Sequence, residues 1–192
     1  MVRWEPGARD RLQAAAIALF LERGYEETTV QDIAAAAGLT ERTFFRHYAD
    51  KREVLFGGGE AYRTGFIEGI DQAPTGSSAL DLVSAGLVAG SAFFTAERRP
   101  WSRNRQRVID ANPALQEREA RKRAVLADAM DAALRERGVD EVEARLVAEI
   151  GSAVFSTAFR RWLSADEERP LADIELELLD RLRALMPAGA PT

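Results

Sequence analysis

Residue types that commonly carry out chemistry are scarce in this chain of 192 residues. It has no cysteine, which excludes disulfides, thiolate nucleophiles, zinc fingers and iron–sulfur clusters. His47 is the single histidine, so a multi-histidine metal site is excluded and only a carboxylate site would remain. A Ser–His–Asp site would have to be built on His47, and no nucleophile elbow surrounds it. We therefore predict no catalytic site and no metal site, and expect that the protein is not an enzyme.

Arginine is the abundant cationic residue, and two segments of the chain carry a local excess of positive charge. Residues 42–52 hold four cations against the single acid Asp50, a surplus of three in a chain whose net charge is −5. This run would also suit an ordinary solvated helix face. The second run, residues 98–107, contains no acid and five arginines: Arg98, Arg99, Arg103, Arg105 and Arg107. Because like charges at such short spacing repel, the second run indicates an anionic partner, such as a phosphate, a carboxylate or an acidic surface.

The elements that must position these residues are helices, because helical periodicity dominates the chain and strand alternation is almost absent. An apolar stripe predicts a first helix over residues 7–23, ended by Gly24. After a linker at 74–78, longer helices are predicted over residues 79–97, 101–111, 113–137, 141–163 and 171–186, the last stopped by Pro187. We predict an all-α protein of about nine helices, with one domain over 1–56 and a second over 57–192.

Three short helical units lie between residues 28 and 56. Thr29, with an acid three residues later, predicts an N-terminal cap and a helix that closes at Gly38 after two turns. Thr40 caps the next helix and Asp50 the third, and the sequence leaves open whether the third continues through 57–59. Gly38 can adopt the left-handed conformation that a tight turn requires. This spacing predicts a helix-turn-helix whose second helix presents Glu41, Arg42, Thr43, Arg46 and His47 on its polar side.

This segment resembles the tetracycline-repressor (TetR) family of bacterial transcriptional regulators. The resemblance covers about a quarter of the chain and falls on the helix 9–24, Tyr25, Thr28-Thr29, Ile33-Ala34, Ala37-Gly38, residues 43–48 and Lys51. The remaining helices match the family in number and length only. The resemblance implies a homodimer in which each N-terminal bundle places its second short helix in a major groove of operator DNA. The C-terminal bundle would dimerise and bind a small effector.

Carried over residue by residue, the resemblance implies base-edge contacts from Thr40, Arg42 and Thr43, with Arg46 as a further candidate. The Arg42 guanidinium suits simultaneous bonds to guanine O6 and N7, worth ~1–3 kcal/mol of discrimination. Phosphate contacts are implied for Thr29, Gln31, Phe45, His47 and Lys51. The family usually has Tyr where Phe45 stands, so we expect a weaker contact there, because Phe lacks the hydroxyl.

Aromatic residues recur in the C-terminal half and suggest an effector site. Phe93 and Phe94 with Trp101 form one group, and Phe155 and Phe159 form another with Trp162. Each could be plain core, and together they could line an apolar pocket. The segment 108–119 resembles, more loosely, a branch of the family associated with acyl-coenzyme-A-like ligands. That implies a tunnel for an acyl chain with arginines at its mouth.

Within the second arginine run, Arg103 and Arg107 stand four residues apart and so share one helix face, where they could meet the charged end of such a ligand. Aromatic or cationic hydrophobic compounds are the alternative effectors, and no other cofactor is expected.

The last predicted helix carries a leucine-rich seam, formed by Leu171, Ile174, Leu178, Leu182 and Leu185 at spacings of 3, 4, 4 and 3. The preceding helix carries the small residues Ala148, Gly151 and Ala158. Together they predict a self-complementary four-helix dimer interface, although the seam could also serve the internal core.

The N-terminus has no apolar stretch typical of a secretion signal, and the longest uncharged segment, 82–96, has 15 residues. A bilayer span needs ~18. We expect a soluble, cytoplasmic regulator with no membrane partner that represses transcription until an effector releases it. The alternative is a helical DNA-binding or partner-binding regulator without a small-molecule effector.

Overall fold

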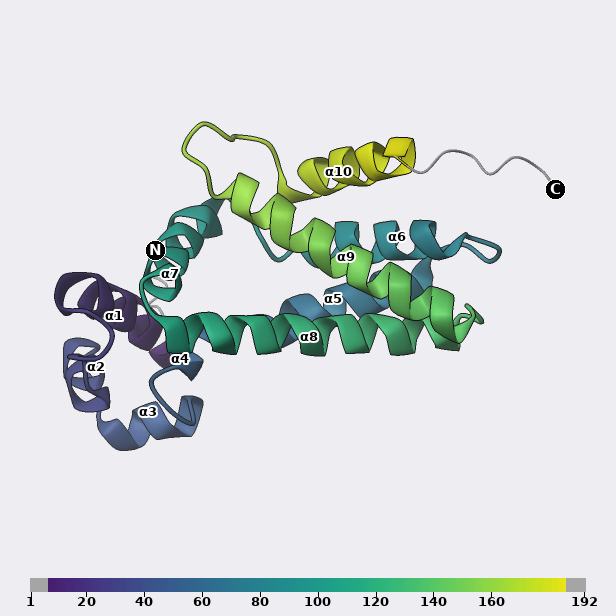
Figure 1. Ribbon diagram of the computed structural model, residues 1–192. Coiled ribbons are helices and arrows are strands. Elements are labelled where there is room, and N and C mark those ends of the chain that lie inside the picture. Colours follow the sequence, from purple (N-terminus) through teal and green to yellow (C-terminus); the bar gives the residue numbers. More distant parts are fainter. Residues whose placement is uncertain (1–6, 186–192) are drawn as a thin grey trace, which may run out of the picture. The chain divides into compact units, whose positions relative to one another are not determined.

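The computed structural model describes residues 7–185, and within them it contains ten α-helices, one short 3-10 helix and no strand (Figure 1). The all-α prediction is confirmed. The helices are α1 (Ala8–Arg23), α2 (Val30–Ala36), α3 (Glu41–His47), α4 (Glu53–Phe56), α5 (Gly59–Gln72), α6 (Ala79–Ser91), α7 (Arg99–Asp110), α8 (Pro113–Glu136), α9 (Glu141–Trp162) and α10 (Leu171–Leu185), with the 3-10 helix η1 at Ala96–Arg98. The predicted end of the last helix at Met186 and its stop at Pro187 lie outside the described residues.

The chain forms two compact units that are not simple halves of the sequence. The first unit contains residues up to Gly59 together with Pro100–Ala120, and the second contains Glu60–Arg99 together with residues from Arg121 onward. A division into 1–56 and 57–192 would place α7 and the start of α8 with the C-terminal helices. They belong to the first unit because Val108, Ile109 and Leu115 are buried in the same core as the N-terminal helices.

The glycines at 57–59 interrupt the helix that begins after Asp50. α4 ends at Phe56, residues 57–58 form a turn, and α5 begins at Gly59. Arg9 donates a hydrogen bond to the Gly57 carbonyl and lies over the Tyr48 ring. A Cβ at Gly57 would approach the Arg9 guanidinium to 2.9 Å. The point left open by the sequence is thus settled, with two separate helices, one in each unit.

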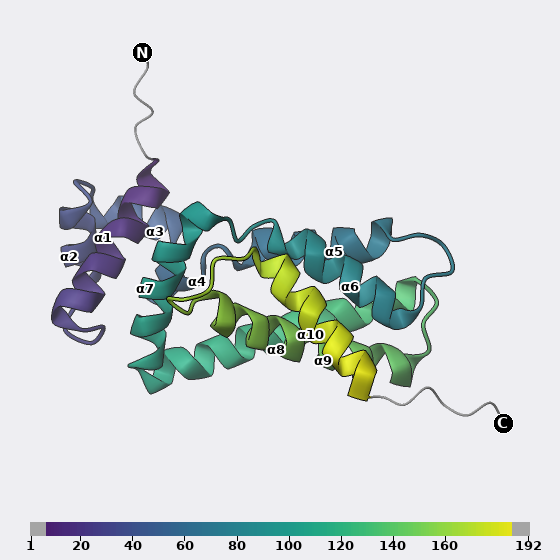
Figure 2. The ribbon, with the colours of Figure 1, turned by 90° about the horizontal axis from the view of Figure 1, so that it is seen from above.

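In the second unit, α6 packs against α9 and α10 (Figures 1 and 2). On its other side α6 meets α5 through glycines. A Cβ at Gly69 would lie 2.6 Å from the Ala85 carbonyl oxygen, and one at Gly90 would overlap the Phe66 ring. The absence of side chains at these positions therefore lets the two helix backbones touch.

Helix α6 ends at Ser91, six residues before the predicted end at Glu97. The amides of Phe93 and Phe94 bond to carbonyls three residues earlier, Gly90 and Ser91, so the chain leaves the α-helix in tight turns. The prediction of a continuous helix over 79–97 was wrong, and Phe93 and Phe94 stand in the connection after α6.

The small residues of α9 have a role other than the predicted one. Ala148, Gly151 and Ala158 are buried within the chain, and a Cβ at Gly151 would lie 2.8 Å from Val83 and 2.9 Å from Met130. They allow α9 to pack against neighbouring helices of its own unit and do not lie on an exposed face. Leu171 and Ile174 of the predicted seam are likewise buried in the core of the second unit.

Within residues 7–185 no single helix is long and apolar enough to cross a membrane. Only the consecutive segments 79–91 and 96–110 reach that length when they are taken together.

Candidate DNA interface and effector site

Helix α2 begins with a complete capping box, as its sequence predicts. The Thr29 hydroxyl oxygen accepts a hydrogen bond from the Asp32 amide at 3.1 Å, while the Asp32 carboxylate accepts one from the Thr29 amide at 2.9 Å. The Thr29 hydroxyl also donates to Asp32 at 2.6 Å, and these bonds lower the pKa of the Asp32 carboxyl. Thr29 and Gln31 are both exposed at this end of the helix.

The turn after α2 is built on Gly38, whose φ is +66°. The Gly38 amide donates to the Ala35 carbonyl at 3.0 Å, and the Leu39 amide donates to the Ala34 carbonyl at 2.8 Å. This is a Schellman motif, which requires the left-handed conformation that glycine adopts without strain. Leu39 packs on the core of the first unit, so the motif fixes where the next helix starts.

Helix α3 is capped by Thr40, whose hydroxyl oxygen accepts a hydrogen bond from the Thr43 amide at 3.2 Å. The two threonine hydroxyl groups lie 3.1 Å apart. Both candidate base-reading threonines are therefore held at the first turn of α3, where the cap orients their side chains.

One side of α3 is buried and the other is open. Phe44 is fully buried and Tyr48, just after the helix, is 3% exposed, so these two rings attach α3 to the core. Phe45 is 54% exposed, and its ring contacts Phe44 edge-on. The open side also carries three exposed cationic or titratable residues, Arg42, Arg46 and His47. A two-turn helix with this face can lie in a DNA major groove.

Lys51 is placed differently from its predicted role. Its ammonium group donates hydrogen bonds to the carbonyls of Tyr25 at 2.9 Å, Glu26 at 3.3 Å and Thr28 at 3.1 Å. It also lies 4.3 Å from the centroid of the Tyr25 ring. An ammonium group has three donors, and here each has a backbone acceptor in the α1–α2 connection. The phosphate contact of Lys51 stays a prediction.

Asp50 stabilises the turn that leads into α4, whose N-cap position is Arg52. Its carboxylate accepts from the amides of Arg52 at 2.8 Å and Glu53 at 3.2 Å, and the Arg52 guanidinium binds it at 2.6 Å. The Arg52 hydrogen bond is the main reason that the pKa of the Asp50 carboxyl is lowered. One cation of the first arginine run is thus neutralised locally, which leaves Arg42 and Arg46 as its exposed charges on α3.

The predicted aromatic residues meet in the second unit. Phe94 lies at the centre, with ring centroids 5.1 Å from Phe93, 5.7 Å from Phe155 and 5.2 Å from Phe159. Three further rings complete what we call the Phe94 cluster: Tyr62, Phe66 and Trp162. Tyr62 and Phe66, on α5, were missed because their sequence neighbourhood gives no sign that α5 packs against α6.

Trp101 does not join this cluster. It is partly buried against the core of the first unit, with the N-terminal helices. The sequence placed it with Phe93 and Phe94 because it lies only seven residues after Phe94. The turn and the 3-10 helix between them separate these positions into different units.

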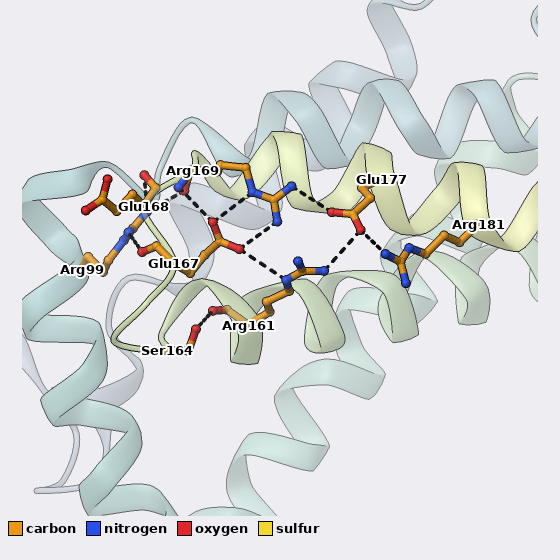
Figure 3. Close-up of polar contacts among 8 residues, drawn as sticks. All are labelled: Arg99, Arg161, Ser164, Glu167, Glu168, Arg169, Glu177 and Arg181. Carbon is orange, nitrogen blue, oxygen red and sulfur yellow. Dashed lines mark hydrogen bonds and ion pairs between the residues drawn. The ribbon is translucent and has the colours of Figure 1, made fainter.

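Arg99 and its surroundings form a network that closes the α9–α10 connection (Figure 3). The Arg99 guanidinium donates to the carbonyls of Glu167 and of Arg169, the latter at 2.6 Å, and lies 4.8 Å from the Trp162 ring. Beside it, Arg169 binds Glu167 at 2.8 Å and Glu177 at 2.8 Å. These contacts, led by the Arg169 hydrogen bonds, lower the pKa of Glu167 to about 2.

The other arginines of the second run lie on α7 in the first unit, apart from Arg98, which stacks on Phe93 at 4.3 Å. Arg105 donates to the Leu55 carbonyl at 2.7 Å and to Glu119 at 3.0 Å, so it helps to fasten α7 to α4. Arg103 is half-buried and Arg107 is exposed. The structure therefore places these two candidate anion-binding residues in a different unit from the Phe94 cluster.

Comparisons with known proteins agree with this arrangement. Residues 12–56 match the family model for bacterial regulatory proteins of the tetR family, and residues 77–187 match that for the MftR C-terminal domain. The chain is 41% identical over 81 residues to TcmR, an HTH-type transcriptional regulator of Streptomyces glaucescens, covering 42% of this chain and 36% of TcmR. It is 35% identical over 101 residues to MftR of Mycobacterium tuberculosis, named as a regulator of mycofactocin biosynthesis, covering 53% and 50%.

Among solved structures, Thermus thermophilus FadR, a TetR-family repressor in complex with lauroyl-CoA, shares the fold at 24% identity. The match covers 96% of this chain and 98% of FadR, with a TM-score of 0.57. The chain aligns with at most half the length of the relatives TcmR and MftR. The C-terminal match alone spans more than half of the chain. The chain therefore belongs to the tetR family of bacterial regulatory proteins, with a C-terminal domain of the MftR type.

Proposed function

We propose that the protein is a homodimeric repressor that binds operator DNA in the bacterial cytoplasm and is released by an amphipathic small molecule. The observation that carries the DNA-binding part is the open side of α3. A short helix held by a Schellman turn and a threonine cap presents Arg42 and Arg46 beside exposed Phe45 and His47. In this proposal Arg42 contacts base edges together with Thr40 and Thr43, and the exposed residues around them contact phosphate and sugar.

The dimer is proposed to form through α9 and α10. Their exposed apolar side chains are Val142 (68% exposed), Leu146 (60%), Leu176 (38%) and Leu185 (79%). In a monomer these apolar side chains are exposed to solvent, whereas a second copy of the chain would bury them. The two copies would place their α3 helices about 34 Å apart, the spacing of successive major grooves.

The effector is proposed to place its apolar part against the Phe94 cluster. The contacts among its rings show that large apolar side chains from α5, α9 and the connection after α6 converge there. An acyl-coenzyme A is one candidate, in line with the ligand of FadR and with the MftR-type domain, and other amphipathic compounds remain alternatives. Arg103 and Arg107 stay candidates for an anionic group on the first unit.

The test of this function begins with selection of bound duplexes from a random DNA pool by the full chain. We expect enrichment of an inverted repeat, because a two-fold symmetric dimer reads two half-sites. Arg42→Ala with Arg46→Ala should reduce affinity for the enriched sequence about a hundredfold, at ~1–3 kcal/mol for each base contact. Arg63→Ala, which removes a half-buried, ion-paired arginine on α5, is the matched control and should bind normally.

Effector release is tested on the same complex by adding long-chain acyl-coenzyme A during an anisotropy measurement. Release at micromolar ligand supports the ligand-controlled repressor. A chain that binds the repeat and responds to no amphipathic compound would instead be a DNA-binding regulator without an effector. Absence of any enriched sequence would refute the DNA-binding function itself.

A further inference from the structure

Helix α10 buries a carboxyl group that the preceding proposals do not use. Glu175 is 0% exposed and shares the core-facing side of α10 with Leu171, Ile174 and Leu179. The Ser91 hydroxyl, at the end of α6, donates a hydrogen bond to its Oε2 atom. Its other oxygen, Oε1, is buried and has no hydrogen-bond partner among residues 7–185.

This arrangement is costly for the folded protein. A buried polar atom without a partner loses its hydration and gains nothing in return. Burial raises the pKa of Glu175 to about 8, which the Ser91 hydrogen bond only partly offsets, and no charged neighbour contributes to the shift. A leucine would fill this position between other leucines without that cost. An acid retained there needs another reason, and a ligand that satisfies Oε1 would supply it.

The carboxyl group lies next to the Phe94 cluster through the residues around Ser91. The Phe94 amide donates to the Ser91 carbonyl at 2.9 Å, and the Phe66 ring packs directly on Gly90. The Phe94 backbone therefore contacts Ser91, the residue that holds Glu175, and the Phe66 ring lies against Gly90, the residue before it. Trp162 and Phe155 belong to the same buried core as Leu171 and Ile174. Glu175 thus supplies a polar atom close to the residues of the Phe94 cluster.

We propose that Glu175 and Ser91 form the polar recognition point of the effector site, where Oε1 accepts a hydrogen bond from a hydroxyl or amine on a ring-containing apolar effector. The rings of the effector would lie against the Phe94 cluster. This inference rests on the proposed effector role of that cluster and adds what the ligand must carry: a hydrogen-bond donor at its buried end, which favours a ring-containing effector over an unsubstituted acyl chain.

The two kinds of donor differ in their proton balance. A hydroxyl can donate to Oε1 of the neutral carboxyl group when the acid proton lies on Oε2, so this binding releases no proton. An ammonium group is stabilised by the carboxylate form, so its binding would expel the Glu175 proton to solvent and tighten as the pH rises from 6 to 8. The hydroxyl and the ammonium group both need Oε1 as their acceptor, and the experiment below distinguishes between them.

The experiment is calorimetric titration of the full chain with three probes of one ring system: 2-naphthol, 2-naphthylmethylamine and 2-methoxynaphthalene, which has no donor. We expect at least one donor probe to bind wild type about tenfold more tightly than the ether, the value of one good hydrogen bond. In Glu175→Leu this preference should vanish while affinity for the ether persists. Asp173→Asn, an exposed acid on the same helix, is the matched control and should keep the preference.

Glu175→Gln identifies the donor. The amide retains an acceptor oxygen and no charge, so a hydroxyl preference should survive in this variant and an ammonium preference should be lost. Glu175→Met is the second apolar variant if Glu175→Leu does not fold, as judged by circular dichroism.

Three results would overturn the inference: no binding of any probe, equal binding of donor and ether by wild type, or a preference that persists in the apolar variants. Operator binding is measured on the same samples without probe. If wild type binds DNA normally while the donor preference is absent, the recognition point is refuted and the DNA-binding function stands.

Discussion

The ammonium group of Lys51 lies 4.3 Å from the centre of the Tyr25 ring and 2.9 Å from the Tyr25 carbonyl oxygen. Lys51 also donates hydrogen bonds to the carbonyls of Glu26 and Thr28, so its contacts stabilise the connection between α1 and α2. Burial of the Tyr25 side chain raises the pKa of its hydroxyl to about 12.

Lys51→Met should therefore lower the free energy of unfolding by about 1–3 kcal/mol, because three backbone acceptors lose their donor. Urea denaturation followed by circular dichroism measures the loss. Arg52→Met, which removes an exposed ion pair with Asp50, should change the free energy of unfolding much less, because exposed ion pairs contribute little. Equal midpoints for Lys51→Met and wild type would show that these bonds are not formed in solution.

Arg42→Ala should lower affinity for the selected operator more than affinity for random DNA, since a base-edge contact carries sequence information. We expect a loss of about tenfold or more on the operator alone. His47→Ala, if His47 contacts phosphate, should weaken both duplexes equally. Fluorescence anisotropy at several salt concentrations measures both variants. A uniform loss for Arg42→Ala would remove it from the base-reading set.

Leu146→Asp should dissociate the proposed dimer and leave the fold intact, because the side chain is 60% exposed in the single chain. The dimer should weaken by at least roughly thirtyfold, the effect of losing an interface hot spot. Analytical ultracentrifugation measures the change. Val125→Asp, which alters a half-exposed side chain on α8, is the control and should remain dimeric. A wild-type chain that sediments at 21.2 kDa at micromolar concentration would contradict the dimer outright.

Gly90→Ala should destabilise the second unit, since the added Cβ would overlap the Phe66 ring. We expect a cost of about 1–3 kcal/mol, typical of overpacking in a dense core. Gly7→Ala is the comparison, because its Cβ would meet nothing closer than Asp10 at 3.6 Å. Thermal denaturation should show a lower midpoint for the first variant only. If the stability of Gly90→Ala equals that of wild type, α5 and α6 are further apart in solution than in the structure.

Glu175 should make the stability of the protein depend on pH. Its pKa is about 8 in the folded chain against 4.5 for a fully hydrated glutamate, so between these values the unfolded chain releases a proton that the folded chain keeps. Stability is therefore greatest below about pH 4.5 as far as this group is concerned, and is lost as the pH rises toward 8. Relative to Glu175→Gln, wild type should lose on the order of 3 kcal/mol across this range. Urea denaturation at pH 5 and pH 8 measures this change. If the free energy of unfolding changes by the same amount between the two pH values in wild type and in Glu175→Gln, the prediction is wrong.

The helix-turn-helix could be predicted from the sequence because its determinants are local. The Thr29 and Thr40 caps and the Gly38 turn involve partners within five residues, so spacing alone reveals them. The buried Phe44 and the exposed polar residues of α3 follow from the helical period in the same way. The meeting of Phe93 and Phe94 with Phe155 and Phe159 was also anticipated, although the membership of Tyr62 and Phe66 was not.

The tertiary structure alone decided which charged and small residues act within the chain. Arg99, Arg105 and Lys51 look alike in the sequence as candidate anion binders, yet each donates to backbone carbonyls far away along the chain or in a neighbouring connection. The small residues of α9 gave no sign of which helix they face, and they proved to be buried within the chain. A long cationic side chain, or a helix face of small residues, could contact several different partners. The residues next to it in the sequence therefore do not determine which partner it contacts. The partner is chosen when distant helices pack and a particular carbonyl or core surface must be satisfied there.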